Sequence, residues 1–185
     1  MKIAFSPFPE LKTERLHLRR LTLNDRYELM WLRSDERVNQ YLGRSGSVNI
    51  NEAMDFIAKI DKTLEEGKGG YWVISLAENP ALIGTICLWN FKPEKDLVEL
   101  GYELSPMYQG KGIMHEAMKK IIEYAFDTMQ AKILTALIDP HNVPSRRVLE
   151  KCGFKLDVGH HYVTANDAEG QSVYFLLSDT WNNKT

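Results

Sequence analysis

Residues 97–117 read LVELGYELSPMYQGKGIMHEA, and this stretch decides the fold. Its first part alternates: Glu99, Gly101 and Glu103 fall on one side, and the bulkier apolar or aromatic residues fall on the other. A period of two is typical of a β-strand. From residue 112 apolar side chains recur at helical spacing, at Met114, Ala117, Met118, Ile121, Ile122, Ala125 and Met129. We therefore predict a strand over 97–104, a short turn over 105–111 and a long amphipathic helix.

The turn itself carries Gln109, Gly110, Lys111 and Gly112, with no acidic residue. A helix start leaves its first N–H groups without intrahelical partners and carries the positive end of the helix dipole. Glycines at this place let a bulky anion approach the backbone. The pattern predicts a phosphate cradle, and therefore a ligand that carries phosphate.

Two common phosphate-binding motifs do not fit this turn. A Walker loop needs GxxxxGK followed by Ser or Thr, and no such string occurs. A dinucleotide fingerprint needs a third glycine, but His115 stands in its place. The pattern that remains is Gln-x-x-Gly-x-Met over 109–114. An ordinary strand-to-helix turn, with glycines for geometry alone, is the other interpretation.

Further motifs occur along the chain: LKTERLHLRRL over 11–21, VELGYEL over 98–104, Asn142, Ser145 and RVLEKCGF over 147–154. With the glycine turn they resemble the GNAT superfamily of N-acetyltransferases. They resemble above all its RimJ/RimL-like branch, which acetylates amino groups of ribosomal proteins and other amines. The family's loop reads Gln/Arg-x-x-Gly-x-Gly/Ala, and Met114 departs at the last position, where a side chain can point away while its N–H still donates. The resemblance spans about residues 11–177, with the motifs in the family's order.

The resemblance implies acetyl-CoA as co-substrate and assigns the residues that bind it. The implied catalytic residues are Glu99, as base or substrate-orienting group, Ser145, as donor to the leaving thiolate, and Asn142, which would bond the pantetheine arm. The backbone of Tyr102 and Leu104 would bond the cofactor amides as an added strand, and the Tyr102 hydroxyl is a second thiolate donor. The implied cofactor-binding set is Tyr102, Leu104, Gln109, Gly110, Lys111, Gly112, Ile113, Met114, Asn142 and Ser145.

The residues themselves leave alternatives open. Two carboxylates on one strand face, Glu99 and Glu103, suggest a polar cleft wall, and a carboxylate beside an apolar cofactor can have its pKa raised into a useful range for a base. The same face can instead be solvated, and Glu103 or solvent can be the base. Asn142 precedes Pro144, which suits the first turn of a helix, so Asn142 can be a simple helix cap.

The remaining elements follow from periodicity and turn residues. We expect strands at 15–21, 71–76, 82–90, 133–138, 154–164 and 172–177, and helices at 24–42 (capped by Asn24), 51–66 and from Asn142 to Gly153. Strands 97–104 and 133–138 flank a helix and should be parallel. The expected fold is mixed α/β: a mostly antiparallel twisted sheet, one parallel strand pair forming the acyl-CoA cleft, and helices on both faces. We expect one domain, 1–185, with its core at about 11–178.

Composition sets the limits on partners. The 185 residues are 44% hydrophobic with a net charge of −2, which favours a globular domain without a broad basic face for nucleic acid. A local basic group at Lys111, Lys119, Lys120, Arg146 and Arg147 can meet the cofactor 3′-phosphate or be plain solvated surface.

No signal-peptide pattern or long apolar run occurs, so we expect a cytoplasmic protein that does not bind membranes. Cys87 and Cys152 fit reduced thiols, and no Cys, His or Asp spacing predicts a metal site. A homodimer is compatible with the sequence.

The expected activity is acetyl transfer from acetyl-CoA to a primary amine by direct attack in a ternary complex. The acceptor is a protein or peptide N-terminus or a small-molecule amine, drawn to an acidic face at Glu99 and Glu103. The alternative is an acyl-CoA-binding sensor or scaffold of the same fold. Acceptor specificity is expected in residues 43–49 and in the closing hairpin.

Overall fold

The computed structural model describes residues 1–44, 48–163 and 169–182. One eight-stranded sheet has the strand order β1-β2-β3-β4-β5-β6-β8-β7. The neighbouring strands pair antiparallel except β5 and β6, which are parallel. The strands are β1 Leu11–Lys12, β2 Leu16–Arg20, β3 Gly70–Leu76, β4 Asn79–Lys92, β5 Leu97–Leu104, β6 Ile133–Ile138, β7 Lys155–Leu156 and β8 Ser172–Leu177.

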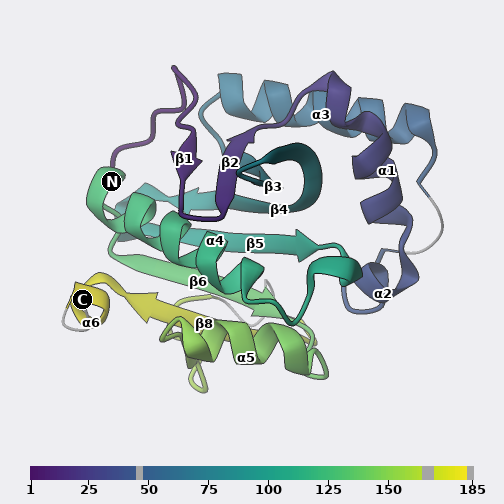
Figure 1. Ribbon diagram of the computed structural model, residues 1–185. Coiled ribbons are helices and arrows are strands. Elements are labelled where there is room, and N and C mark those ends of the chain that lie inside the picture. The colour runs from purple at the N-terminus through teal and green to yellow at the C-terminus, as the bar shows by residue number, and fades with distance from the viewer. Residues whose placement is uncertain (45–47, 164–168, 183–185) are drawn as a thin grey trace.

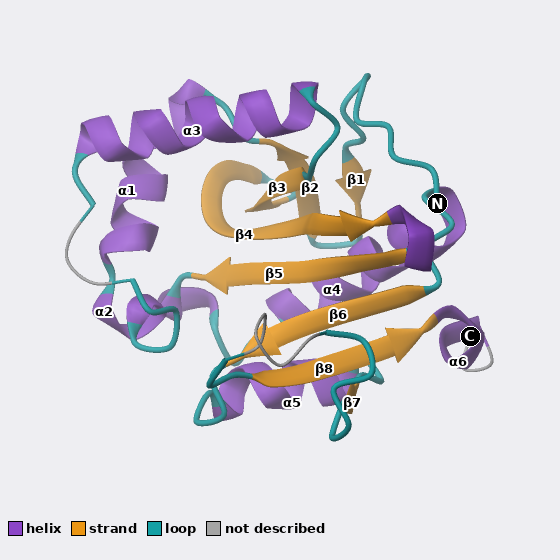
Figure 2. Ribbon diagram, turned by 180° about the vertical axis from the view of Figure 1, so that it is seen from behind, coloured by secondary structure: helices purple, strands orange, loops and turns teal. Residues whose placement is uncertain are grey.

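Helices lie on both sides of this sheet. Helices α4 and α5 lie in front of it in Figure 1 and behind it in the reverse view of Figure 2. Helices α1 and α3 pack against β4 and β3. The helices are α1 Arg26–Ser34, α2 Glu36–Asn39, α3 Ile50–Glu65, α4 Ile113–Glu123, α5 Val143–Lys151 and α6 Ser178–Asn182. The expected mixed α/β fold with a single parallel pair is confirmed.

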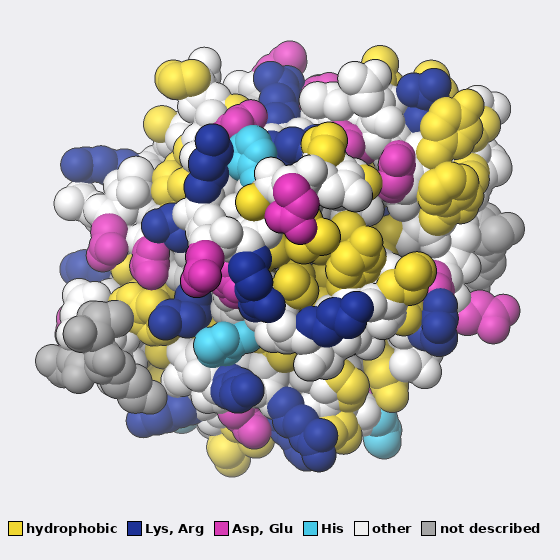
Figure 3. Space-filling view, in the orientation of Figure 1, with side chains coloured by type: hydrophobic (Ala, Val, Ile, Leu, Met, Phe, Trp, Pro, Cys, Tyr) yellow, Lys and Arg dark blue, Asp and Glu magenta, His cyan; other side chains and the backbone are white. Residues whose placement is uncertain are grey.

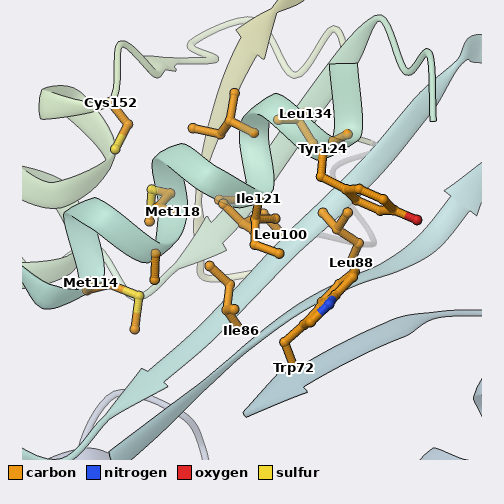
Figure 4. Close-up of a cluster of buried hydrophobic side chains, with 14 of the residues drawn as sticks. Trp72, Ile86, Leu88, Leu100, Met114, Met118, Ile121, Tyr124, Leu134 and Cys152 are labelled. Atoms are coloured by element: carbon orange, nitrogen blue, oxygen red, sulfur yellow. The ribbon is translucent and has the colours of Figure 1, made fainter. Parts of the chain in front are cut away.

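Strand alternation separates two hydrophobic clusters. On the α4 side, Trp72, Ile86 and Leu88 of the sheet pack with Met118 and Ile121 of α4, and all five are fully buried (Figure 4). On the opposite side, Tyr71 and Val73 pack with residues of α1 and α3, namely Leu29, Leu32, Ala53 and Ile57. Each sheet face therefore has a helical layer of its own, as the period-two pattern requires.

The predicted helix over 24–42 is wrong in two respects. The chain breaks at Asp35, which has extended backbone angles and caps α2 by accepting the Arg37 N–H at 2.9 Å. The start is capped by Thr22 and Asp25 in a reciprocal capping box, and Asn24 is not the cap. An aspartate that offers the backbone an alternative acceptor interrupts a helix that apolar periodicity alone would continue.

The predicted strand over 154–164 is also too long. Only Lys155–Leu156 pairs with β8, and the chain then turns at the buried Asp157, which accepts the Tyr162 N–H at 3.0 Å. Residue 164 lies outside the described residues. The hairpin with β8 exists, but a carboxylate that binds the following backbone replaces most of its first strand. Residues 11–21, which resemble one opening strand, form the two strands β1 and β2, and α6 was not expected from the sequence.

The parallel pairing between β5 and β6 is short. It runs from Leu97 opposite Ile133 to Glu99 opposite Thr135. Beyond this point β5 stays paired with β4 as far as Leu104, and β6 stays paired with β8 as far as Ile138. Figure 2 shows the two strands diverging toward their C-terminal ends. In the described chain, the backbone edges of 100–104 and 136–138 therefore face a gap instead of each other.

Candidate active site

A cleft of about 1570 Å³ opens at this gap. Its walls come from β5, β6 and the starts of α4 and α5, and on the other side from α1, α3 and the chain after α2. Pockets for one small molecule typically have a volume of about 300–1,000 Å³. The cleft is thus large enough for a long cofactor and a second substrate.

The glycine turn forms one end of this cleft. Gly110 and Gly112 have φ values of +74° and +76°, and Gly112 is the N-cap of α4. Left-handed backbone of this kind favours glycine and turns successive N–H groups to one side. Over the described chain, the N–H groups of 110–115 donate to no other protein group. The structure thus presents the unpaired donors that the sequence predicted for a phosphate cradle.

Side chains around the turn hold it in place. Gln109 donates from Nε2 to the Leu104 carbonyl at 3.0 Å and so ties the turn to the end of β5. Arg15 of the segment before β2 donates to the Lys111 carbonyl at 3.1 Å, a contact that sequence reasoning missed. Met114 is buried in the core, so its side chain leaves the turn open.

Basic side chains near the turn only partly match the expectation. Of the five predicted candidates Arg147 lines the cleft, while Lys120 pairs with Glu123 at 2.9 Å. Lys151, at the far end of α5, also lines the cleft and was missed. Burial, followed by the charges of Lys151 and Lys119, lowers the pKa of His115. Lys and Arg side chains are frequent over α5 and the start of α4 in Figure 3, among scattered carboxylates.

Tyr102 and Ser145 meet on the α4 side of the gap. The Tyr102 hydroxyl lies 2.5 Å from the Ser145 hydroxyl, and either oxygen can donate. Burial raises the pKa of Tyr102 well above its ordinary value, although the hydrogen bond with Ser145 opposes the shift, so the phenol stays protonated at neutral pH. The Asn142 side chain accepts the Ser145 N–H at 3.1 Å, which is the capping role. Tyr102 and Ser145 belong to one predicted site, but their mutual hydrogen bond was not predicted from the sequence.

Glu99 approaches the gap from the other face. It is only 9% exposed, at the last register position shared by β5 and β6, and it accepts a hydrogen bond from Asn90 Nδ2 at 3.0 Å. Asn90 has a φ of +47° in the irregular part of β4, where the register with β5 shifts. Because successive strand residues point to opposite faces, Glu99 and Tyr102 reach the gap from opposite sides.

Glu103 shares the face of Glu99 but is not a free carboxylate. Arg44 binds it through both terminal nitrogens at 2.8 and 3.2 Å, and Arg33 lies 3.5 Å away. The expected acidic face is therefore wrong at this position, because two guanidinium groups surround Glu103. Sequence spacing gave no sign of this contact, since 59 residues separate Arg44 from Glu103.

Cys87 lies between these two carboxylates, opposite Gly101 in the β4–β5 ladder. Burial and then the charge of Glu103 raise the pKa of its thiol to about 12. Its sulfur donates weakly to the Gly101 carbonyl at 3.5 Å. The thiol is therefore protonated and unreactive at neutral pH.

We expect Cys87→Ala to keep kcat close to that of the wild type, because a thiol that stays protonated is a poor nucleophile and does not attack the thioester to form an acetyl-cysteine intermediate. Steady-state CoA release measures kcat, and peptide mass spectrometry after incubation with acetyl-CoA shows whether the sulfur is acetylated. Loss of turnover in Cys87→Ala, together with an acetylated Cys87 peptide in the wild type, would contradict this expectation.

Three further observations bear on the site. Within the described ranges, no group of three or more His, Cys, Asp or Glu residues could hold a metal ion. No helix among the residues described is long and apolar enough to cross a membrane. Residues 45–47 and 164–168, which fall in or beside the segments predicted to set acceptor specificity, lie outside the described residues, but Arg44 from the first of these segments lines the cleft.

Comparison with known proteins gives the class of this site. Residues 15–155 match the acetyltransferase (GNAT) domain. An uncharacterized N-acetyltransferase, p20 of Bacillus licheniformis, is 32% identical over 145 residues, which cover 78% of this chain and 82% of p20. The chain therefore belongs to the GNAT family of acetyltransferases and is an N-acetyltransferase enzyme.

Solved structures share the fold. Mycobacterium smegmatis RimJ in complex with CoA-disulfide has a TM-score of 0.76 at 17% identity, over 89% of this chain and 83% of RimJ. The microcin C7 self-immunity acetyltransferase MccE, in complex with acetyl-CoA and AMP, has a TM-score of 0.74 at 20% identity, over 89% and 93% of the two chains. RimJ/RimL-like acetyltransferases are thus among the structural neighbours.

Proposed function

We propose that this enzyme transfers an acetyl group from acetyl-CoA to a primary amine by direct attack, with both substrates bound in the cleft between β5 and β6. The observation that carries this proposal is the conjunction of an unpaired strand edge and an unpaired glycine turn in one cleft. A cofactor with amides in its arm and a pyrophosphate at its end matches both features.

The residues present fit acetyl-CoA. The N–H groups of 110–115 would hold the pyrophosphate, because they are unpaired and a helix dipole supports them. The edge of β5 that faces the gap would bond the pantetheine amides as a neighbouring strand would, at Tyr102 and at the Leu104 N–H, because the Leu104 carbonyl already accepts from Gln109. Arg147 and Lys151 are the cationic candidates for the 3′-phosphate. Acetyl-CoA supplies an activated thioester.

Side chains on the two faces of the sheet would divide the proton transfers. Glu99, on the α1 and α3 side, would accept a proton from the incoming ammonium, directly or through water. The Tyr102–Ser145 pair, on the α4 side, would donate to the departing thiolate, because both hydroxyls are neutral and hydrogen-bonded to each other. Asn142 would support this pair through the cap that fixes Ser145.

CoA release tests the proposal against a sensor or scaffold role. The purified protein is incubated with acetyl-CoA and a panel of N-terminal peptides and small amines. We expect release of CoA that depends on the amine, with an N-acetylated product. Tight acetyl-CoA binding without release for any amine, hydroxyl or thiol acceptor would instead indicate an acyl-CoA-binding protein that does not turn over.

We expect Glu99→Gln to lower kcat/KM by about tenfold or more and to flatten the acid limb of its pH profile, because the amide cannot accept a proton. Glu103→Gln is the matched comparison on the same face and should cost less with a simple primary amine that carries no anionic group. Equal kcat/KM values for Glu99→Gln and the wild type at every pH would assign the base elsewhere or to solvent.

A further inference from the structure

Beside Glu99, the acceptor side of the cleft carries an excess of positive charge. The whole chain has a net charge of −2. On this side, however, the acidic side chains that line the cleft are Glu99 and Glu103. The cationic side chains that line the same region are Arg33, Arg37, Arg44, Lys59 and Lys68. Arg37 is paired with Asp35 at 2.6 Å and Lys68 with Glu66 at 2.7 Å, so the excess rests on Arg33, Arg44 and Lys59 against the two glutamates. A local field of this sign draws anions and not ammonium groups.

The centre of this region is a partly buried triad. The side chains of Arg33, Arg44 and Glu103 are 17%, 18% and 15% exposed. Two guanidinium groups share one carboxylate, so the triad carries one net positive charge. A cation so far removed from water is costly unless an anion neutralises it. Among the described residues, the printed ion pairs of Arg33 and Arg44 are both with Glu103, so one of the two positive charges has no carboxylate of its own.

The triad is also held in place by its neighbours. The buried Asn39 accepts from Arg44 Nε at 2.8 Å and donates to the Arg33 carbonyl at 2.7 Å. The guanidinium group of Arg33 stacks on the Phe56 ring at 3.9 Å. Orienting contacts of this kind preserve the planar fork that binds a carboxylate or phosphate through two parallel hydrogen bonds.

The distance between the triad and Glu99 indicates how long the acceptor should be. Glu103 lies four positions after Glu99 on β5, which is about 13 Å along a strand at ~3.3 Å per residue. Both side chains point to the α1 and α3 face, whereas the α4 side holds the Tyr102–Ser145 pair. The triad thus lies on the acceptor side of the gap, on the order of 10 Å from the proposed base.

We propose that the acceptor is a primary amine that also carries an anionic group, a carboxylate or a phosphate, and that Arg33 and Arg44 bind this group. The inference rests on the proposed function and adds the class of acceptor. It replaces the expectation of a plain cationic amine, because Glu103 is occupied by the arginines that create the anion site. Arg33 and Arg44 are specificity-determining residues that position the acceptor.

Matched acceptors test this inference. The first set is 8-aminooctanoate, 8-aminooctyl phosphate and 8-aminooctanamide, of which the last has no anionic group. The second set is the peptide amides Ala-Ala-Glu and Ala-Ala-Gln. Within each set, we expect kcat/KM to be about tenfold or more higher for an acceptor with the anionic group than for its amide analogue, as charged hydrogen bonds of this kind imply. Comparison of kcat/KM among the carboxylate, phosphate and peptide acceptors shows which kind of anionic acceptor the enzyme prefers.

Variants of the triad give opposite expected results. The anionic preference is the ratio of kcat/KM for an anionic acceptor to kcat/KM for its amide analogue. Arg44→Gln should bring this ratio close to one, while Arg44→Lys, which keeps the charge without the planar guanidinium group, should keep part of the preference. Glu103→Gln should increase the preference, because it removes the carboxylate that competes for the guanidinium groups. Acetyl-CoA affinity should be unchanged in Arg44→Gln, and a large loss of that affinity would assign the arginines to a cofactor phosphate and overturn the inference.

Binding measurements separate this inference from the proposed function. Calorimetry on the CoA-loaded protein compares 8-acetamidooctanoate with 8-acetamidooctanamide. Selective binding of the anion, lost in Arg44→Gln, supports the inference even if no acceptor is turned over, in which case the proposed function alone fails. Turnover of neutral and anionic amines with equal kcat/KM values, unchanged by Arg44→Gln, refutes the inference and leaves the proposed function intact.

Discussion

Replacing Gly112 with glutamate is expected to abolish acetyl-CoA binding, the largest effect of any single change considered. Gly112 caps α4 with a φ of +76°, among N–H groups that have no protein acceptor in the described chain. A Cβ at this position would lie 3.5 Å from Arg15 Nη2, and a glutamate would add a negative charge beside the N–H groups that would hold the pyrophosphate. Isothermal titration calorimetry should show no acetyl-CoA binding by a protein whose circular dichroism is that of the wild type.

Controls separate charge from backbone strain. A non-glycine residue at a positive φ costs about 1–2 kcal/mol in backbone strain. Gly112→Ala adds this strain without a charge, so it should lose only part of the affinity for acetyl-CoA. Gly67→Glu puts the same side chain at a φ of +65° after α3, with open space around its Cβ, and should bind acetyl-CoA as the wild type does. Unchanged affinity in folded Gly112→Glu would remove the turn from the cofactor site.

The Tyr102–Ser145 pair is expected to behave as one unit. Ser145→Ala and Tyr102→Phe should each lower kcat by on the order of 10², with little change in acetyl-CoA affinity, because each removes a link in the donation to the thiolate. The double variant should be scarcely slower than either single one, since the two hydroxyls lie 2.5 Å apart and share one function. Stopped-flow or steady-state CoA release measures these rates.

A capping variant serves as the control for this pair. Ser145→Ala keeps the backbone N–H that Asn142 caps, so α5 should remain intact. Asn142→Ser also retains a capping oxygen but loses the amide, and should weaken acetyl-CoA binding more than it slows turnover. Rate losses that multiply in the double variant would mean that Tyr102 and Ser145 act independently. An unaffected kcat in Ser145→Ala would leave that hydroxyl a packing role.

Much of the fold could be predicted because it depends on local patterns. Alternation over 97–104 correctly assigned Glu99 and Tyr102 to opposite faces, and the spacing from Met114 onward correctly gave the buried side of α4. Pro144 and Asn142 correctly marked the start of α5. Each of these patterns depends only on residues that are close together in the sequence.

The parts that failed depend on contacts between distant residues. The carboxylate of Glu103 looked free in the sequence, but Arg33 and Arg44 reach it from segments far away in the chain. The break at Asp35 arises because its side-chain carboxylate accepts a backbone N–H and so competes with continuation of the helix. The divergence of β5 and β6 depends on which outer strands hold each of them, and no single segment encodes it.

Amide hydrogen exchange with and without acetyl-CoA tests the central claim most directly, namely that the cofactor lies between the diverging strands with its pyrophosphate on the glycine turn. We predict fast exchange in the free protein at 110–115 and along the gap side of 100–104, and marked protection of both segments when acetyl-CoA is added. Saturating acetyl-CoA that protects other segments and leaves these two unchanged would contradict it.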